Sequence, residues 1–219
     1  MYVPDAYEVK DTALIYEFIG NYPFATLVVS NATNLEANHI PLCLKKQSNQ
    51  EIILQGHVAR NNPLWSILAP NAHALAIFHG PDAYISPSWY ATKNETGRVV
   101  PTWNYMVAHV RGRVSTIEDP LWLREHLQHL TAKQEQGLPK PWTLEDAPSE
   151  FIENMIGAVV GIEMHVESIT AKFKISQGQT IHNKLGVIEG LQQRQLPFDF
   201  LMAKWVATHT DLDAEKDVT

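Results

Sequence analysis

The chain has 219 residues, of which 45% are hydrophobic and 19% charged, and its formal net charge is −7 at pH 7. This composition is typical of a packed globular protein and excludes a largely disordered one. No apolar run approaches the ~20 residues of a membrane helix, no signal peptide is visible at the N-terminus, and the single Cys43 excludes an internal disulfide. We therefore expect a cytoplasmic protein with no membrane segment.

The first half of the sequence predicts one helix followed by a series of strands. Residues 11–20 carry apolar side chains at helical spacing and predict a helix that ends at Gly20. Residues 61–68 predict a second helix, with Asn61 or Asn62 as its cap and a proline in its first turn. Compact apolar and β-branched runs predict strands over residues 24–30, 35–44, 52–58, 73–78 and 84–86.

The second half mixes long strands with helices. Residues 106–115 alternate between apolar and polar side chains, which predicts a half-exposed strand, and residues 159–169 predict another long strand. Helices are expected over residues 119–137 and 149–157, and as a pair within residues 180–209.

Six or seven strands with peripheral helices predict a mainly β chain of the α+β class, built as a small barrel. No glycine-rich phosphate loop follows a strand, which disfavours a dinucleotide-binding fold. We expect one domain over residues 1–219, in which residues 171–219 form a partly helical C-terminal extension.

The stretch from residue 80 to residue 105 is the stiffest and most aromatic part of the sequence. It holds two tryptophans, three tyrosines and three prolines between two predicted strands. A simple connection between strands is normally short and polar. We therefore expect a long loop that forms a wall, either packed on its own core or beside a ligand.

Three further phrases join this stretch, in residues 37–42 (ANHIPL), 56–63 (GHVARNNP) and 171–177 (AKFKISQ). In this order they resemble the PaiB-type family of FMN-binding negative transcriptional regulators, a branch of the FMN-binding split barrels. The likeness runs from Tyr2 to Leu191. It implies an FMN-binding split β-barrel that forms a homodimer with the flavin at the dimer interface.

His57 and Arg60 lie three residues apart where a predicted strand meets a predicted helix. Arginine can hold a phosphate with two parallel N–H donors, and the free amides of a helix start favour an anion. An exposed arginine beside a structural histidine is the alternative. The resemblance favours a phosphate clamp at Arg60 and adds Val58 and Ala59 to the cofactor-binding set.

An earlier strand supplies the second group of predicted flavin contacts, Asn38, His39, Ile40 and Pro41. Polar side chains in an apolar strand need partners when they are buried, and the backbone there could meet the flavin ring edge. A hydrogen-bonded structural pair is equally compatible with the sequence. Pro41 has no N–H to donate, which predicts an irregular or edge strand.

Thr102, Trp103 and Asn104 are the candidates for contacts with the flavin ring, since an indole can cover it and a carboxamide can both donate and accept. A core tryptophan beside a turn-forming asparagine is the alternative.

Lys172 and Lys174 lie two apart in an extended segment and share a face. With Gln177 they are expected to meet the phosphate or ribityl end, from either subunit, or to solvate an edge strand.

Direct DNA binding is doubtful, because duplex binders use a basic face and this chain is acidic. Of its scattered basic residues only Arg111, Arg113, Lys172 and Lys174 are close-set, and the helix expected near residues 198–209 carries Lys204 alone. Such a helix does not resemble a recognition helix.

Other function classes remain open. One is an FMN-dependent oxidoreductase of the pyridoxamine-phosphate-oxidase or flavin-reductase type, and another is a haem-handling split barrel with His209 as axial ligand. A metal site built on His126 and His129 with His165 or His182 lacks a carboxylate and a recognisable pattern. No nucleophile with a base is visible, so we predict no metal and name no catalytic residue.

Overall fold

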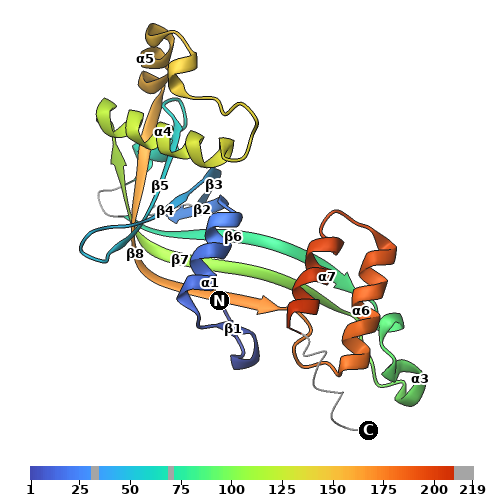
Figure 1. The fold of residues 1–219 in the computed structure, drawn as a ribbon. Helices are drawn as coiled ribbons and strands as arrows, with labels where there is room; N and C mark the ends of the chain where they lie inside the picture. The colour runs from blue at the N-terminus through green and yellow to red at the C-terminus, as the bar shows by residue number, and fades with distance from the viewer. Residues whose placement is uncertain (31–34, 69–71, 210–219) are drawn as a thin grey trace. The chain divides into compact units, whose positions relative to one another are not determined.

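The computed structural model describes residues 1–30, 35–68 and 72–209 (Figure 1). Its strands are β1 (Glu8–Val9), β2 (Phe24–Ser30), β3 (Leu35–Pro41), β4 (Cys43–Lys46), β5 (Ile52–Ala59), β6 (Ala72–Ile85), β7 (Thr102–Ile117) and β8 (Val159–Lys174). Its helices are α1 (Thr12–Asn21), α2 (Leu64–Ile67), α3 (Thr92–Thr96), α4 (Pro120–Glu135), α5 (Ser149–Gly157), α6 (Ile181–Arg194) and α7 (Asp199–Thr208), with 3-10 turns η1 (Asp5–Tyr7), η2 (Pro87–Trp89) and η3 (Leu144–Asp146).

The strands are hydrogen-bonded in the order β3-β2-β6-β7-β8-β5-β4, and β1 pairs with β8. The pairings of β1, β2, β4 and β5 are all antiparallel. The expected mainly β chain with added helices is thereby confirmed. No helix in the described ranges is long and apolar enough to cross a membrane.

The chain divides into two compact units, which we describe separately. Unit 1 comprises Met1–Ile15, His79–Ala108 and Thr170–Thr219, and unit 2 comprises Tyr16–Phe78 and His109–Ile169. The strands β6, β7 and β8 contribute residues to both units. The expected single domain with a C-terminal extension over residues 171–219 stays a prediction, and residues 210–219 of it lie outside the described residues.

Helix signals in the sequence located the helices of unit 2 closely. Helix α5 has the expected bounds, and α4 begins after Asp119, whose carboxylate accepts a hydrogen bond from the N–H of Leu121 at 3.1 Å. Helix α2 is shorter than expected, although the side chain of Asn62 accepts from the N–H of Leu64 at 2.8 Å, as a helix start requires. Local capping chemistry therefore accounts for the starts of α4 and α2.

The strands of unit 2 are arranged around β2 and β5. Strand β2 lies between β3 and β6, and strand β5 lies between β4 and β8. The expected strand over residues 35–44 is two strands, because Pro41 cannot donate and the N–H of Leu42 instead donates to the carbonyl of Pro23 at 2.9 Å.

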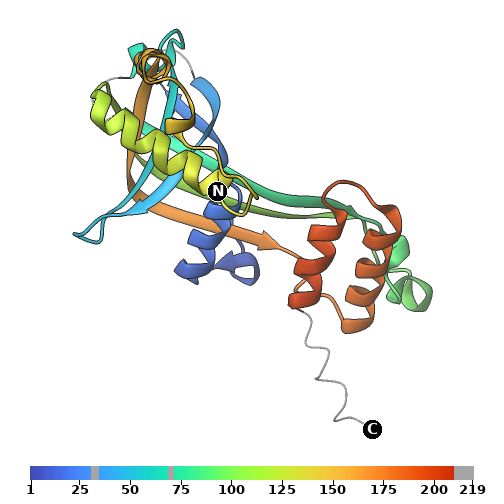
Figure 2. The same ribbon diagram turned by 45° about the horizontal axis from the view of Figure 1, so that its top comes forward.

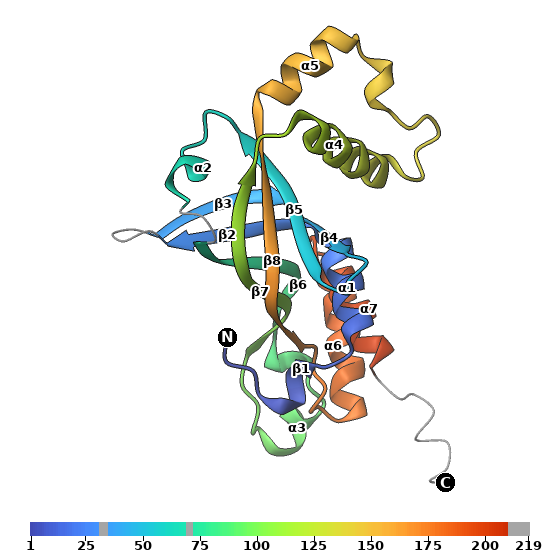
Figure 3. The ribbon, with the colours of Figure 1, turned by 90° about the vertical axis from the view of Figure 1, so that its left-hand side faces the viewer.

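A satellite core of four buried residues lies between α4 and α5: Leu123, Leu144, Ile152 and Ile156. Figure 3 shows these two helices with their connecting segment.

In unit 1 the structure corrects the long loop expected over residues 80–105. Strand β6 continues to Ile85 and β7 starts at Thr102, so the loop comprises residues 86–101 and contains η2 and α3. The reason is a short alternation hidden by the aromatic composition: Ala83 and Ile85 are buried while Tyr84 between them is exposed.

The C-terminal part of unit 1 is the expected helix pair, α6 and α7, which lie side by side (Figures 1 and 2). Thr180 caps α6 by accepting from the N–H of Asn183. Val187 and Leu191 of α6 and Met202 and Val206 of α7 are buried. This pair forms the support on which the loop over residues 86–101 is fixed.

Candidate functional site

The loop over residues 86–101 is anchored to α6 through Trp89. An added Cβ on Gly190 would lie 2.3 Å from the Trp89 indole, so only glycine allows this approach. The Arg194 guanidinium lies 5.1 Å from the indole ring centroid and is itself held by Asp199, with 2.8 Å between Nε and Oδ2. Hydrogen bonds from Arg194 lower the pKa of Asp199. The loop is therefore fixed to α6 by the packing of Trp89 and by its cation–π contact with Arg194, which Asp199 holds in place.

Residues at the start of β7 contact residues at the end of β8. The Lys174 ammonium donates to the Thr102 hydroxyl, and the Asn104 amide nitrogen donates to the Ser176 hydroxyl at 2.8 Å. Asn104 is 1% exposed, and its amide oxygen has no hydrogen-bond partner among the described residues. An unpaired buried acceptor costs roughly 1–3 kcal/mol. The structure thus brings together Thr102, Asn104 and Lys174, and leaves one acceptor there without a donor.

Trp103 lies on the opposite face of β7 from these two side chains, as neighbours in a strand do. It is 54% exposed, and its ring meets Tyr84 edge-on with centroids 5.9 Å apart. The indole is therefore a surface side chain, and the alternative of a core tryptophan is wrong.

Lys172 is 8% exposed and lies among three tyrosine rings. Its ammonium is 5.1 Å from the ring centroid of Tyr105, 5.8 Å from that of Tyr2 and 5.9 Å from that of Tyr7. Cation–π contacts of this kind favour a charged lysine in a largely buried place. The side chain of Gln177 accepts from the N–H of Ile175 at 2.8 Å and shapes the turn after β8.

A cavity of about 280 Å³ in unit 1 is lined by the loop, by η1 and by the end of β8. Its polar lining includes Tyr7, Tyr90, Thr92, Arg98, Thr102 and Lys174. No acidic residue lines it within the described residues. Two of the predicted site residues, Thr102 and Lys174, thus face a cavity whose fixed charges are positive.

The predicted residues of β3 lie in unit 2. Strand β3 is at the edge of the strand order, as Pro41 indicated. The Asn38 amide oxygen accepts from Asn62 at 2.7 Å while its amide nitrogen is buried without a partner. His39 is exposed and its Nδ1 is 3.0 Å from the Thr26 hydroxyl, whereas Ile40 is buried. Asn38 thus has an unpaired buried donor as Asn104 has an unpaired buried acceptor within the described residues, and a cofactor role for the β3 residues stays a prediction.

His57 faces a second histidine in unit 2, His126 of α4, with 3.1 Å between Nδ1 and Nε2. Trp122 stacks on His126, and the ring centroids are 5.2 Å apart. Burial lowers the pKa of His57, and burial together with the nearby His57 charge lowers the pKa of His126 to about 4. The pair is therefore neutral near pH 7, with one ring donating to the other.

Arg60 is engaged by its own unit. Its guanidinium donates to the carbonyls of Gly157 at 2.8 Å and Val159 at 3.2 Å and to the Glu118 carboxylate at 2.7 Å. Between these residues in sequence, Val58 is buried and Ala59 is exposed. The predicted phosphate clamp thus has an internal anion beside it, and its cofactor role stays a prediction.

Sequence reasoning missed Arg98, Tyr7 and Tyr90 as companions of Thr102 and Lys174. Arg98 is the only arginine in the aromatic stretch, which was the available signal.

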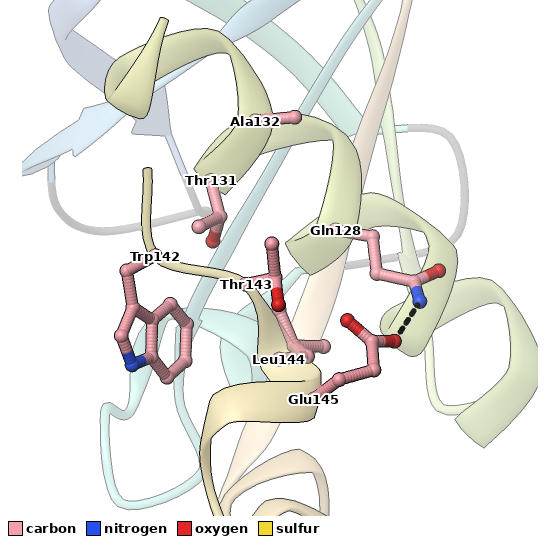
Figure 4. A pocket seen from close by; sticks show the side chains of 7 residues that line it. All are labelled: Gln128, Thr131, Ala132, Trp142, Thr143, Leu144 and Glu145. Atoms are coloured by element: carbon pink, nitrogen blue, oxygen red, sulfur yellow. Dashed lines mark hydrogen bonds between the residues drawn. The ribbon is translucent and has the colours of Figure 1, made fainter. Parts of the chain in front are cut away.

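A second cavity, of about 200 Å³, lies in unit 2 between α4 and residues 142–145 (Figure 4). Trp142 and Glu145 line this cavity, and Gln128 donates to Glu145 at 3.2 Å. None of the predicted site residues is among the described residues that line it.

Comparisons with known proteins agree with the resemblance seen in the sequence. The family model described as "Putative FMN-binding domain" matches residues 1–168. The "Protease synthase and sporulation protein PAI 2" of Bacillus subtilis (strain 168) is 33% identical over 197 residues, which cover 90% of this chain and 92% of that protein. The cofactor indicated by the family is FMN or a related flavin.

Two solved structures show the same fold at low identity. A conserved hypothetical protein of Mycobacterium tuberculosis has a TM-score of 0.56 at 13% identity, covering 82% of this chain and 94% of its own. The FAD and haem binding protein of Mycobacterium smegmatis has a TM-score of 0.52 at 14% identity, covering 76% of this chain and 73% of its own. These likenesses bear on the fold alone and agree with the expected split barrel. By its family match and its relative, the chain belongs to the PaiB-type family of FMN-binding split-barrel proteins.

Proposed function

We propose that this chain is an FMN-dependent regulator and that Thr102, Asn104 and Lys174 of unit 1 contact the flavin. The observation that carries this assignment is the buried Asn104 amide oxygen without a donor. The flavin pyrimidine ring offers an N–H donor to such an oxygen, and the Lys174 ammonium suits the phosphate or ribityl end. The Trp103 indole lies on the opposite face of β7 from Asn104, so it does not cover the same ring, and a flavin contact for it stays a prediction. When bound, FMN supplies the redox chemistry, while these residues hold and orient it.

The regulatory part of the proposal is supported by the name of the Bacillus relative, which refers to protease synthesis and sporulation. The proposal includes a homodimer with the flavin at its interface. Exposed apolar side chains of unit 1, among them Trp103, Val100 and Phe200, are available for burial in such an interface. Light scattering should give twice the chain mass of 24.7 kDa, and a monomer that binds FMN fully would contradict the dimer.

Regulation without a dedicated DNA-binding face is the form we propose. Arg113 forms an ion pair with Glu167 at 2.8 Å, and Lys172 is held among tyrosine rings. Helix α7 buries Met202 and Val206. A gel-shift titration at about 150 mM salt should show weak binding to duplex DNA without sequence preference, because few phosphates are neutralised. Saturable nanomolar binding to one promoter fragment would contradict this.

An FMN-dependent oxidoreductase is the second candidate function, favoured by the polar cavity of unit 1, which has room for a small substrate. It predicts that the flavin-loaded chain oxidises a reduced nicotinamide faster than free FMN does. The absorbance spectrum of the same preparation tests the haem hypothesis, in which His209, stacked on Trp205 here, would be an axial ligand.

The flavin assignment is tested by titrating the flavin-free chain with FMN and with riboflavin. Asn104→Leu should weaken both ligands by roughly tenfold, because losing one hydrogen bond to the shared ring costs on the order of 1.4 kcal/mol. Asn94→Leu, at an exposed asparagine of α3, is the matched control and should change neither. Unchanged affinity in a folded Asn104→Leu variant would remove Asn104 from the site.

A further inference from the structure

The cavity of unit 1 is lined by two cations, of which the proposed flavin contacts use only Lys174. Arg98 and Lys174 line it, and within the described ranges neither forms a salt bridge. The Lys174 ammonium donates to the Thr102 hydroxyl and keeps further N–H groups, and the Arg98 guanidinium has five N–H donors in a planar fork. Cations that line a cavity without a carboxylate are available to an anion from outside.

The remaining wall adds neutral donors to these charges. Tyr90 is buried, and its burial and the neighbouring Tyr7 raise the pKa of its hydroxyl, which therefore stays protonated near pH 7 and can donate. Tyr7, Thr92 and Thr102 contribute further hydroxyls. The cavity volume of about 280 Å³ lies at the lower limit for drug-sized ligands, roughly 300–1,000 Å³, so it suits a small group rather than a whole flavin nucleotide.

We propose that this cavity is an oxyanion pocket that binds a phosphate group, with Arg98 and Lys174 as its charged contacts. Charge-assisted hydrogen bonds from a guanidinium and an ammonium are the strongest that a protein can offer a phosphate. The backbone N–H of Arg98 donates to the Thr96 hydroxyl at 3.2 Å, which fixes the chain locally beside the cavity. The phosphate has two possible sources, a separate phosphorylated molecule or FMN itself, and only the second rests on the proposed function.

Inorganic phosphate is the probe, titrated into the full chain and followed by calorimetry. Saturable binding is expected, and Arg98→Gln and Lys174→Gln should each weaken it by roughly tenfold or more. Lys93→Gln is the matched control, since Lys93 lies in the same loop, is exposed and does not line the cavity. The affinity should fall with added salt, because the site is partly open to solvent.

Comparison of the flavin-free with the FMN-saturated chain distinguishes the two sources. Equal phosphate binding in both supports a separate phosphorylated ligand and removes Lys174 from the flavin contacts. Displacement of phosphate by FMN but not by riboflavin supports the phosphate of the flavin. Absence of saturable binding, or an equal loss in Arg98→Gln and Lys93→Gln, would overturn the pocket. Flavin absorbance measures cofactor binding independently, so failure of the pocket and failure of the proposed function give different results.

Discussion

Two regions of the chain hold positive charge in opposite ways. In unit 2, the charged Arg60 donates to Glu118 and to two carbonyls, whereas His57 and His126 form a neutral pair because the pKa of each is lowered. In unit 1, Arg98 and Lys174 face a cavity that no acidic residue lines within the part of the chain that the structure describes.

The difference shows how a structural cation is distinguished from one available to a ligand. A guanidinium whose donors are already satisfied stabilises the fold around it, and a ligand must replace its partners before binding. A cation without a carboxylate partner has no such competitor. We therefore propose ligand binding in the region of Lys174, with Arg60 as the test of that proposal.

The largest expected effect is the loss of stability in acid caused by the neutral histidine pair. His126 has a pKa of about 4 in the folded chain, while an unfolded histidine titrates near 6.5. Between these values the unfolded chain binds more protons, so the free energy of unfolding falls as the pH falls from about 6.5 to about 4, on the order of 3 kcal/mol in total. Denaturant unfolding at several pH values measures this.

His126→Gln is the control for the pH dependence of the free energy of unfolding. The carboxylates of the chain titrate in the same pH range, and because they remain in the variant, only the contribution of His126 is removed. The other charged or titratable groups near His126 are His57, Lys45 and His129. The variant should lose part of the pH dependence even if its stability at pH 7 is lower. An identical pH dependence in both proteins would mean that His126 is not held neutral.

A smaller effect is expected at Arg60. Arg60→Ala leaves the carbonyls of Gly157 and Val159 without this donor, which should lower the free energy of unfolding by about 1–2 kcal/mol. Arg113→Ala, which removes an exposed pair with Glu167, should cost less than about 1 kcal/mol. If Arg60→Ala instead leaves stability intact and weakens FMN alone by roughly ten- to a hundredfold, Arg60 is the phosphate contact that the sequence predicts.

The smallest effect is expected at Glu118. Glu118→Gln keeps the size of the side chain and removes the anion beside Arg60, which the two carbonyls still hold. Affinities for FMN and riboflavin should then change by less than about twofold, since exposed ion pairs contribute little. Tighter binding of FMN with no change for riboflavin would show that the carboxylate competes with phosphate for Arg60.

The sequence predicted most strands and helices because their signals are local. The alternation over residues 106–115 and the caps at Asp119 and Asn62 each lie within a few residues of the element they define. The bounds of β6 and β7 were missed because proline and aromatic residues concealed a short alternation. Helices and strands were predictable where the residues that define them are close in sequence.

The candidate site was less predictable, because its chemistry depends on distant pairs. Glu118 is 58 residues from Arg60 and the partner of His57 is 69 residues away, so no spacing rule reveals either. Thr102 and Lys174 were predicted, but only through the family resemblance, and their contact joins residues 72 apart. Arg98 carried no motif at all.

A crystal structure of the chain with FMN bound would show whether the flavin lies at Asn104 or at Arg60. We expect the Asn104 amide oxygen to accept a hydrogen bond from the flavin ring, at about 2.7–3.2 Å. The bonds from Arg60 to Glu118 and to the two carbonyls should remain. A flavin bound away from Thr102 and Asn104, with its phosphate on Arg60 in place of Glu118, would contradict this placement.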